Sequence, residues 1–433
     1  MGFLWTLYTV FMGIVFNLET RDHIISAVDM DAPTLGYNRV IETMLGEKAF
    51  AYIARGRELA RKGYKVYSLG IGQPDLPTPD HIIEAGIKAL REKYTRYTET
   101  PGIPELREAI AEYLNTRYGS DVRPSEVIVT PGTKGAIFLA LLSYLRPGDE
   151  IIIPEPSYPA YSEISKIIGV RRKFIPLKWL GPEKGFALPI EEIREAITER
   201  TRLIVINNPH NPTGGLFSPK QLDEIMEIAR EHRIMVLVDE IYDNFVYDNA
   251  EYKSMISYED WRDYILYTNG FSKTFSMTGW RLGYLVVREE VAKHLPKLAV
   301  NIWGCPVSFG QKAAIEALRG DWTPIREMIK LFQKRRDLLV DKLREIPGFE
   351  VWRSRGAFYV FPRVRKLLDE IGMDADSLVD YIIDKYHVIL LPGTAFPDKA
   401  GKDYLRLSFC TDFESIEKGV ERIKEAVESL LKR

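Results

Sequence analysis

Polar residues that could take part in chemistry follow several apolar runs of the sequence, at the point where each run ends. In chain order they are Thr133 and Lys134 after the run 127–130, Asn211 after 203–207, Asp239 at the end of 235–239, and Lys273 after 265–269. A lysine just after a buried strand is partly desolvated, which lowers the pKa of its amine and makes it a nucleophile. An aspartate at the end of a buried strand must be paired or hydrogen-bonded. Asp239 is therefore either part of a structural salt bridge or an anion that faces a cationic ligand.

A glycine turn, Pro131-Gly132-Thr133-Lys134-Gly135, stands directly before a helical pattern. Such a turn presents backbone N–H groups and the positive end of the helix dipole, which together form a phosphate site. A plain strand-to-helix turn is the alternative. Asn-Pro pairs mark a second turn at 208–212, where the amide of Asn211 could serve a ligand oxygen. Each residue alone has an ordinary structural explanation, but polar groups at four strand ends on one edge favour a ligand site.

Seven short apolar runs alternate with helical patterns in the middle of the chain. The runs are 127–130, 150–154, 172–177, 203–207, 235–239, 265–269 and 283–287, and the helical patterns between them include 135–145, 189–196 and 219–232. Most of the runs lack polar alternation, which is typical of strands buried on both faces. The order predicts an α/β domain with a seven-stranded, mostly parallel sheet. Ligands of such sheets lie outside the carboxyl ends of the strands.

The pattern changes after about residue 321 and predicts a second, smaller α+β domain. Its expected elements are a helix at 325–346, strands at 349–352 and 357–361, a helix at 377–386, strands at 388–391 and 404–408, and a helix from Phe413. The segment 55–78 precedes the large sheet and could return to this smaller domain, which the sequence alone leaves open. The expected domains are 1–40 as an N-terminal extension, 41–78 as the first part of the small domain, 79–320 as the large domain, and 321–433 as the C-terminal small domain.

Composition excludes several classes of function. The 433 residues carry 59 Lys+Arg and 61 Asp+Glu, a net charge of −2, so nothing favours a nucleic-acid partner. Two cysteines cannot build a zinc site or a disulfide framework, so we expect no metal and a cytoplasmic location.

The residues 3–16 form an apolar run near the N-terminus. A membrane-spanning helix needs about 20 such residues, and no basic segment or small-residue cleavage site accompanies the run, so we expect no membrane role. Two interpretations stay open: a start codon placed too far upstream, with Met30 as one alternative, or a segment that docks on a hydrophobic groove.

The stretch SKTFSMTGWRLGY at 272–284 resembles the pyridoxal-phosphate lysine motif of class I/II aminotransferases, which belong to the fold type I, aspartate aminotransferase superfamily. The likeness extends, in family order and spacing, to RYTETPGIPELREAI at 96–110, NPHNPTG at 208–214, VDEIYDNFVY at 238–247 and YLRLSF at 404–409. It covers residues 66–431, so residues 1 to about 40 fall outside it.

The resemblance implies a pyridoxal 5'-phosphate cofactor and a role for each matching residue. Lys273 would bond covalently to the cofactor aldehyde and then carry a proton between the substrate Cα and the cofactor. Asp239 would keep the pyridine nitrogen protonated, which makes the ring a better electron sink. Tyr242 and Asn211 would hydrogen-bond the ring oxygen O3′.

The remaining matches imply a phosphate end, a ring face and a substrate end. Arg281, Ser272 and the backbone of Thr133 and Lys134 would hold the phosphate, and Tyr158 would stack on the ring. Tyr97 matches a tyrosine that reaches the phosphate of the other subunit, which implies a homodimer. Arg406 would clamp the substrate α-carboxylate, assisted by the backbone N–H of Gly72. For Tyr158 and Tyr97 simple packing is the alternative, and Ser272 could merely cap its turn.

The resemblance implies an enzyme that moves an amino group from an L-amino acid to a 2-oxo acid by a ping-pong mechanism. The segment 301–306 offers no arginine for a second carboxylate, and Trp303 and Tyr97 favour aromatic or broad apolar donors, with 2-oxoglutarate as acceptor by family habit. A C–S β-lyase or a cyclopropane-forming synthase on the same fold is the alternative enzyme. A transcription regulator with an aminotransferase-like domain is disfavoured, because only about 40 residues without a basic helix precede the likeness.

Overall fold

The computed structural model describes residues 36, 38–46, 48–397 and 399–432. The chain divides into two units, residues 1–43 and 44–433. The described part of the first unit contains one helical turn, α1 (Val40–Thr43). The apolar run 3–16 lies outside the described residues, so both of its interpretations stay open. The second unit carries every element discussed below.

All seven predicted runs are strands of one sheet, with ends that differ from the prediction by two residues at most. Across the sheet, the strands are β2 (Val127–Thr130), β10 (Gly283–Val286), β9 (Ile265–Gly270), β8 (Met235–Asp239), β7 (Thr201–Asn207), β3 (Glu150–Glu155) and β4 (Arg171–Pro176). Strands β9, β8, β7, β3 and β4 pair in parallel, and β10 is antiparallel to both of its neighbours. The prediction of a seven-stranded, mostly parallel sheet is confirmed.

Both faces of the sheet are covered by helices, which explains why the strands lack polar alternation. In β7, Leu203 and Val205 belong to one apolar cluster, and Ile204 and Ile206 belong to another. The first cluster contains residues of α5 (Gly132–Tyr144), α6 (Ala160–Ile168) and α11 (Leu295–Ala299). The second contains residues of α3 (Asp80–Arg91), α4 (Pro104–Tyr118), α8 (Pro219–His232) and α12 (Ser308–Arg319). Because successive strand residues point to opposite faces, a sheet covered on both sides needs apolar residues throughout.

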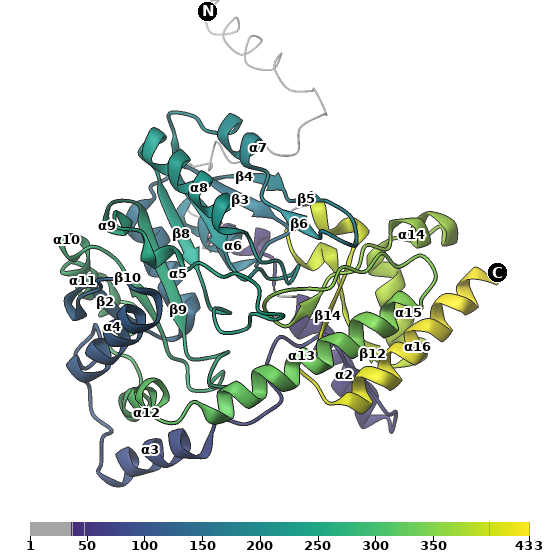
Figure 1. The fold of residues 1–433 in the computed structure, drawn as a ribbon, viewed down its shortest axis with the longest axis horizontal. Helices are drawn as coiled ribbons and strands as arrows, with labels where there is room; N and C mark the ends of the chain where they lie inside the picture. The colour runs from purple at the N-terminus through teal and green to yellow at the C-terminus, as the bar shows by residue number, and fades with distance from the viewer. Residues whose placement is uncertain (1–35, 37, 47, 398, 433) are drawn as a thin grey trace, which may run out of the picture. The chain divides into compact units, whose positions relative to one another are not determined.

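The C-terminal part has its own core and its own small sheets. Its elements are α13 (Thr323–Arg344), β11 (Tyr359–Val360), α14 (Arg365–Ile371), α15 (Ala375–Tyr386), β12 (Val388–Ile389), β13 (Leu391–Pro392), β14 (Leu405–Ser408) and α16 (Phe413–Leu431). In Figure 1 the strands of the large sheet lie to the left of α14, α15 and α16, and α13 extends between the two parts. Strand β1 (Tyr67–Ser68) pairs in parallel with β12, so the segment 55–78 does return to this part of the chain. The predicted domain boundaries themselves stay predictions.

The structure corrects two strand predictions in this part. The run 349–352 is not a strand, because only Glu350 forms a bridge, with Arg363. Its apolar residues are buried by packing, with Val351 in the C-terminal core and Trp352 in the core of the large sheet. The run 388–391 is two strands, β12 and β13, which belong to different sheets.

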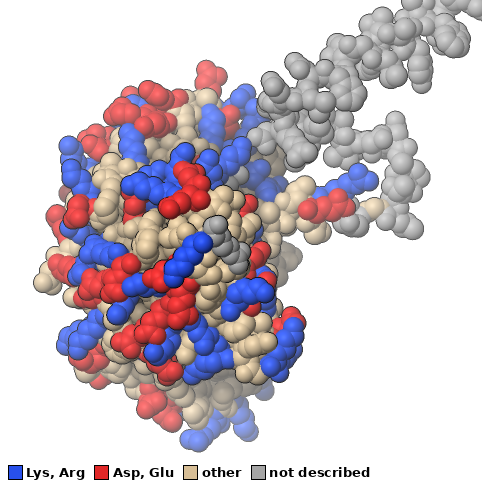
Figure 2. Space-filling view, turned by 90° about the vertical axis from the view of Figure 1, so that its right-hand side faces the viewer, with Lys and Arg blue, Asp and Glu red and all other residues tan. Residues whose placement is uncertain are grey.

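The remaining elements were not predicted individually, apart from the helix at 189–196. They are α2 (Lys48–Arg61), the hairpin β5 (Lys178–Trp179) and β6 (Phe186–Ala187), α7 (Ile190–Glu195), α9 (Trp261–Tyr264) and α10 (Glu289–Ala292). Among the described residues, no helix is long and apolar enough to cross a membrane. On the face drawn in Figure 2, Lys and Arg are interspersed with Asp and Glu.

Candidate active site

A cavity of about 540 Å³ lies at the carboxyl ends of β8 and β9, where the polar residues of the sequence were expected to meet. Eleven of the predicted site residues line it: Gly72, Thr133, Lys134, Tyr158, Asn211, Asp239, Tyr242, Ser272, Lys273, Arg281 and Arg406. Tyr97 does not, and 94% of its surface is exposed. The structure thus brings together all but one of these side chains. Their individual roles remain predictions.

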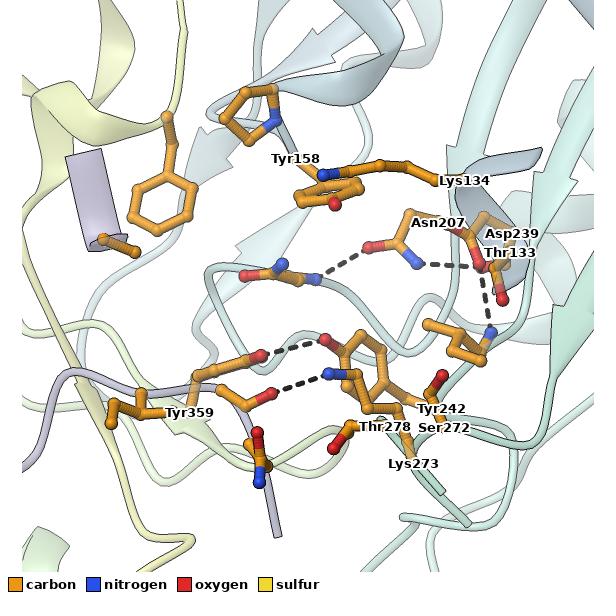
Figure 3. Close-up of a pocket in the computed structure, with 18 of the residues that line it drawn as sticks. Thr133, Lys134, Tyr158, Asn207, Asp239, Tyr242, Ser272, Lys273, Thr278 and Tyr359 are labelled. Carbon is orange, nitrogen blue, oxygen red and sulfur yellow. Dashed lines mark hydrogen bonds between the residues drawn. The ribbon is translucent and has the colours of Figure 1, made fainter. Parts of the chain in front are cut away.

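Lys273 follows β9 and points into the cavity toward the loop that contains Gly72 (Figure 3). Its Nζ donates a hydrogen bond of 2.6 Å to the carbonyl oxygen of Gly72. Residue 72 must be glycine here, because a Cβ would lie 2.2 Å from the hydroxyl oxygen of Tyr359. This hydrogen bond holds the amine of Lys273 at the cavity.

Asp239 is the last residue of β8 and only 3% exposed. Its Oδ2 accepts a hydrogen bond of 2.7 Å from the Tyr161 hydroxyl, and its Oδ1 accepts one of 3.2 Å from the backbone N–H of Ile241. Burial raises the pKa of the Asp239 carboxyl to about 6, although these hydrogen bonds and the charge of Lys273 act in the opposite direction. No Lys, Arg or His of the described residues forms a salt bridge with it. The structure therefore favours an anion that faces a cationic ligand over a structural salt bridge.

The glycine turn after β2 is the first turn of α5, which begins at Gly132, three residues earlier than the sequence predicted. Thr133 and Lys134 consequently contribute backbone N–H groups that have no carbonyl partner within the helix. Gly132 has a φ of +74°, and a Cβ there would lie 2.4 Å from Nη2 of Arg281. Arg281 is thus packed against the helix start, and the pair forms an N–H-rich, cationic end of the cavity that suits a phosphate.

Arg406 lies on β14, lines the cavity and is 4% exposed. Its Nη2 donates to the carbonyl oxygen of Gly70 at 2.7 Å, and its Nη1 donates to Oδ1 of Asn211 at 3.2 Å. Its guanidinium carbon lies 4.3 Å from the ring centroid of Tyr359 and 4.8 Å from that of Phe396. Arg406 is therefore a buried arginine held by polar and aromatic neighbours. Asn211, expected to serve the cofactor, also contacts this arginine.

Reasoning from the sequence missed several lining residues, among them Asn207, Tyr161 and Tyr359. Asn207 donates through Nδ2 to the carbonyl oxygen of Asp239 at 2.8 Å and accepts from the backbone N–H of Asn211 at 2.8 Å. Tyr161 stands three positions after Tyr158, on the first turn of α6. Tyr359 lies within a run that was interpreted as a simple strand, and a tyrosine in a short apolar strand gives no signal beyond packing.

The residues present fit pyridoxal phosphate. The buried carboxylate of Asp239 suits a protonated ring nitrogen, and the start of α5 with Ser272 and Arg281 suits the phosphate. Tyr158 and Lys134 lie on one side of the cavity, and Tyr242, Ser272 and Lys273 lie on the other (Figure 3). Among the described residues no cluster of His, Cys, Asp or Glu could hold a metal ion.

Comparison with known proteins identifies the family. The family model "Aminotransferase class I and II" matches residues 64–423. The chain belongs to this family. The aspartate aminotransferase of Sulfurisphaera tokodaii is 43% identical over 92% of this chain and 99% of its own length, and the aromatic-amino-acid aminotransferase 2 of Thermococcus litoralis is 36% identical over 86% and 94%. The structure of the aspartate aminotransferase of Thermus thermophilus with maleate has a TM-score of 0.84 at 33% identity, over 91% of this chain and all of that one.

The protein is therefore an amino-acid aminotransferase of fold type I, and family and fold imply a pyridoxal phosphate cofactor. The cavity with Lys273 and Asp239 is the place where these residues could do that chemistry.

Replacing Asp239 with Asn should change both stability and catalysis. The folded carboxyl, with a pKa of about 6, binds its proton more tightly than the unfolded one at 3.8, so its contribution to stability is lost as the pH rises between these values. The cofactor-free Asp239→Asn protein should lack this loss. The test is the urea midpoint of unfolding of both proteins, measured across that pH range. Burial also raises the pKa of Glu240 to about 7, but this group is the same in both proteins and its effect cancels in the comparison. Parallel curves would contradict a raised pKa at Asp239.

The Asp239→Asn variant should still bind the cofactor but transaminate far more slowly, because an amide cannot keep a ring nitrogen protonated.

Replacing Arg406 with Lys should raise KM and lower kcat for every amino acid alike. A guanidinium offers two parallel donors to a planar carboxylate, whereas an ammonium on a flexible stem cannot reproduce that fork. Because the same clamp orients the substrate Cα–H bond, kcat/KM should fall about 100-fold. Steady-state kinetics with two unlike donors provides the measurement. A loss confined to one donor would mean that Arg406 recognises the side chain instead of the α-carboxylate.

Proposed function

We propose that this aminotransferase holds pyridoxal phosphate in the described cavity and moves the amino group of a broad range of L-amino acids, aromatic ones and aspartate included, to 2-oxoglutarate. The observation that carries this proposal is the pair of additional lysines, Lys134 and Lys48, that line the cavity beside Lys273, Arg281 and Arg406. They provide cations for a second substrate carboxylate, which the segment 301–306 does not.

When bound, pyridoxal phosphate supplies an aldehyde that reacts with amino groups and a ring that takes up the electron pair of the substrate Cα–H bond. Asp239 holds a proton on the ring nitrogen, and the start of α5 with Ser272 and Arg281 holds the phosphate. Asn211 and Tyr242 donate to the ring hydroxyl, and Tyr158 covers one ring face. Each of these groups lines the cavity. The buried ones are held in place by the folded protein, so they need not rearrange when a ligand binds.

Lys273 moves the proton. Its amine would take up the proton from the substrate Cα and pass it to the cofactor, which would keep the amino group when water releases the 2-oxo acid. Arg406 and the backbone N–H of Gly72 bind the α-carboxylate and thereby fix which bond of Cα faces Lys273. The 2.6 Å hydrogen bond between Nζ of Lys273 and the Gly72 carbonyl keeps the amine beside this carboxylate site.

A ping-pong aminotransferase has to accept both substrates in one cavity. 2-Oxoglutarate carries two carboxylates, so Arg406 can bind one and a second cation must bind the other. The Nζ of Lys134 lies 5.7 Å from the ring centroid of Tyr158, the residue expected to cover the cofactor ring. The Nζ of Lys48 pairs with Asp376 at 2.8 Å. We take Lys134, which lies beside the expected ring position, as the first candidate and Lys48 as the second.

Apolar side chains at the cavity provide for aromatic donors. Phe50 and Ile53 of α2 line it together with Ile71, Leu391 and Phe396. Relatives at comparable identity bear the names aspartate aminotransferase and aromatic-amino-acid aminotransferase, which supports a donor range that spans both chemistries.

A screen of half-reactions tests the proposal. Each amino acid is mixed with the loaded enzyme alone, and the cofactor absorbance is followed. Aspartate and aromatic amino acids should convert the cofactor to its amine form. Lys134→Gln should weaken the binding of aspartate and 2-oxoglutarate at least tenfold, as expected for a lost hydrogen bond between charged groups. It should leave the binding of phenylalanine nearly unchanged. Lys48→Gln is the matched control. If it carries the loss instead, the second cation is Lys48; if neither does, the proposed dicarboxylate site is wrong.

The same screen distinguishes the β-lyase alternative. A lyase acting on a C–S bond would release pyruvate and ammonia from a cysteine conjugate without leaving the cofactor in its amine form. No contact in the described cavity specifically favours that reaction.

We further propose a homodimer in which Tyr97 serves the site of the partner subunit, supported by its exposure and its absence from the cavity of its own chain. Mixed dimers of Tyr97→Phe and Lys273→Ala chains test this. If Tyr97 acts across the interface, the hybrid has one site with both native residues and should regain activity that neither variant dimer has. Hybrids without recovery, or an active monomer, would contradict the proposal. A cytoplasmic location is part of the proposal and is consistent with both cysteines being free.

A further inference from the structure

Tyr359 touches both the residue that is proposed to serve the cofactor and the residue that is proposed to bind the substrate. Its hydroxyl oxygen lies 2.9 Å from the hydroxyl oxygen of Tyr242, and its ring centroid lies 4.3 Å from the guanidinium carbon of Arg406. Tyr359 is 1% exposed and lines the cavity (Figure 3).

The strand pairing determines where Tyr359 lies. Tyr359 of β11 is the antiparallel partner of Ser408 of β14, and Arg406 stands two residues before Ser408. Cross-strand partners and residues two positions apart share a face, so Arg406 and Tyr359 are diagonal neighbours on one face of this small sheet. The ring of Tyr359 thus packs against the guanidinium of Arg406. The lack of a side chain at Gly72 leaves room for the Tyr359 hydroxyl.

The hydrogen bond to Tyr242 has a direction that matters for chemistry. A phenol has one proton, so Tyr242 can donate to a cofactor oxygen only if its own proton is not given to Tyr359. Either hydroxyl can be the donor in this geometry. In the arrangement proposed below, Tyr359 donates to Tyr242, so Tyr242 keeps its proton for the cavity.

We propose that Tyr359 is a positioning residue for both ends of the site: its hydroxyl directs the phenol of Tyr242 toward the cofactor, and its ring holds Arg406 for the substrate carboxylate. The proposal rests on the cofactor placement proposed above. It separates two functions of one side chain, the hydroxyl for the cofactor and the ring for the carboxylate.

Two substitutions separate the two functions. Tyr359→Phe removes the hydroxyl and keeps the ring, whereas Tyr359→Leu removes both. The measurements are the dissociation constant and visible spectrum of bound pyridoxal phosphate, and the binding of 3-phenylpropanoate, a carboxylate that cannot react. Tyr359→Phe should weaken cofactor binding about fivefold, as expected for one hydrogen bond, and change the spectrum of the bound cofactor. Its binding of 3-phenylpropanoate should stay within about twofold of the native value. Tyr359→Leu should in addition weaken the carboxylate about tenfold, as expected for a desolvated cation–π contact.

Tyr144→Phe is the matched control, because Tyr144 is a largely buried phenol on α5, away from the cavity lining, and should change neither measurement. An unchanged spectrum and cofactor affinity in Tyr359→Phe, or equal loss of carboxylate binding in the Phe and Leu variants, would overturn the proposal. So would losses that merely follow the melting temperature of the cofactor-free variants. If Tyr359→Leu fails to fold, the split between cofactor and carboxylate binding in Tyr359→Phe still decides. If the native protein itself binds no pyridoxal phosphate, the proposed function fails and the role of the Tyr359 hydroxyl fails with it, whereas the carboxylate measurements still decide the role of the ring.

Discussion

The carboxylate of Asp239, buried at the end of a central strand and without a salt bridge to any described residue, is the constraint around which the site is organised. Burial of an isolated charge is costly, and two hydrogen bonds, from Tyr161 and from the backbone of Ile241, offset only part of that cost, as its pKa of about 6 indicates. A protonated ring nitrogen would complete the compensation. The large sheet thus holds this carboxylate at a buried position, where the positive charge of a ligand can balance it.

Parallel strands explain why the other functional groups meet the same point. Strands β7, β8 and β9 run in one direction, so the residues that follow them, Asn211, Tyr242 and Lys273, emerge at one edge. Helix α5 begins at that edge and adds its N–H groups. The C-terminal part supplies Arg406 from a different sheet, and the returning segment supplies Gly72. The groups expected to bind the cofactor and those expected to bind the substrate carboxylate therefore come from different parts of the chain and line one cavity.

Reasoning from the sequence found the strands and most of the site because both have strong local signals. Buried parallel strands are continuous apolar runs, and Asp239, Lys273 and the glycine turn stand directly at their ends. The failures occurred where burial had another cause. Val351 and Trp352 are apolar because they pack in two cores, not because they pair in a sheet. Tyr161 and Tyr359 escaped because a tyrosine on a helix or a short strand is usually a packing residue, and only the three-dimensional contact of its hydroxyl shows otherwise.

The two tyrosines that the sequence did not reveal, Tyr161 and Tyr359, indicate different roles for neutral and charged side chains in the site. Both hydroxyls contact a group proposed to serve the cofactor: Tyr161 donates to Asp239, and Tyr359 shares a hydrogen bond with Tyr242. Each of these groups has to hold a defined protonation state in a place from which water is largely excluded. A neutral phenol can direct a proton there without adding a charge that would compete with the cofactor or with the substrate carboxylate. The two arginines, Arg281 and Arg406, line the parts of the cavity that are expected to bind the phosphate and the α-carboxylate. In this proposal the arginines bind the charged ends of the ligands, and the neutral phenols orient the groups that hold or move protons.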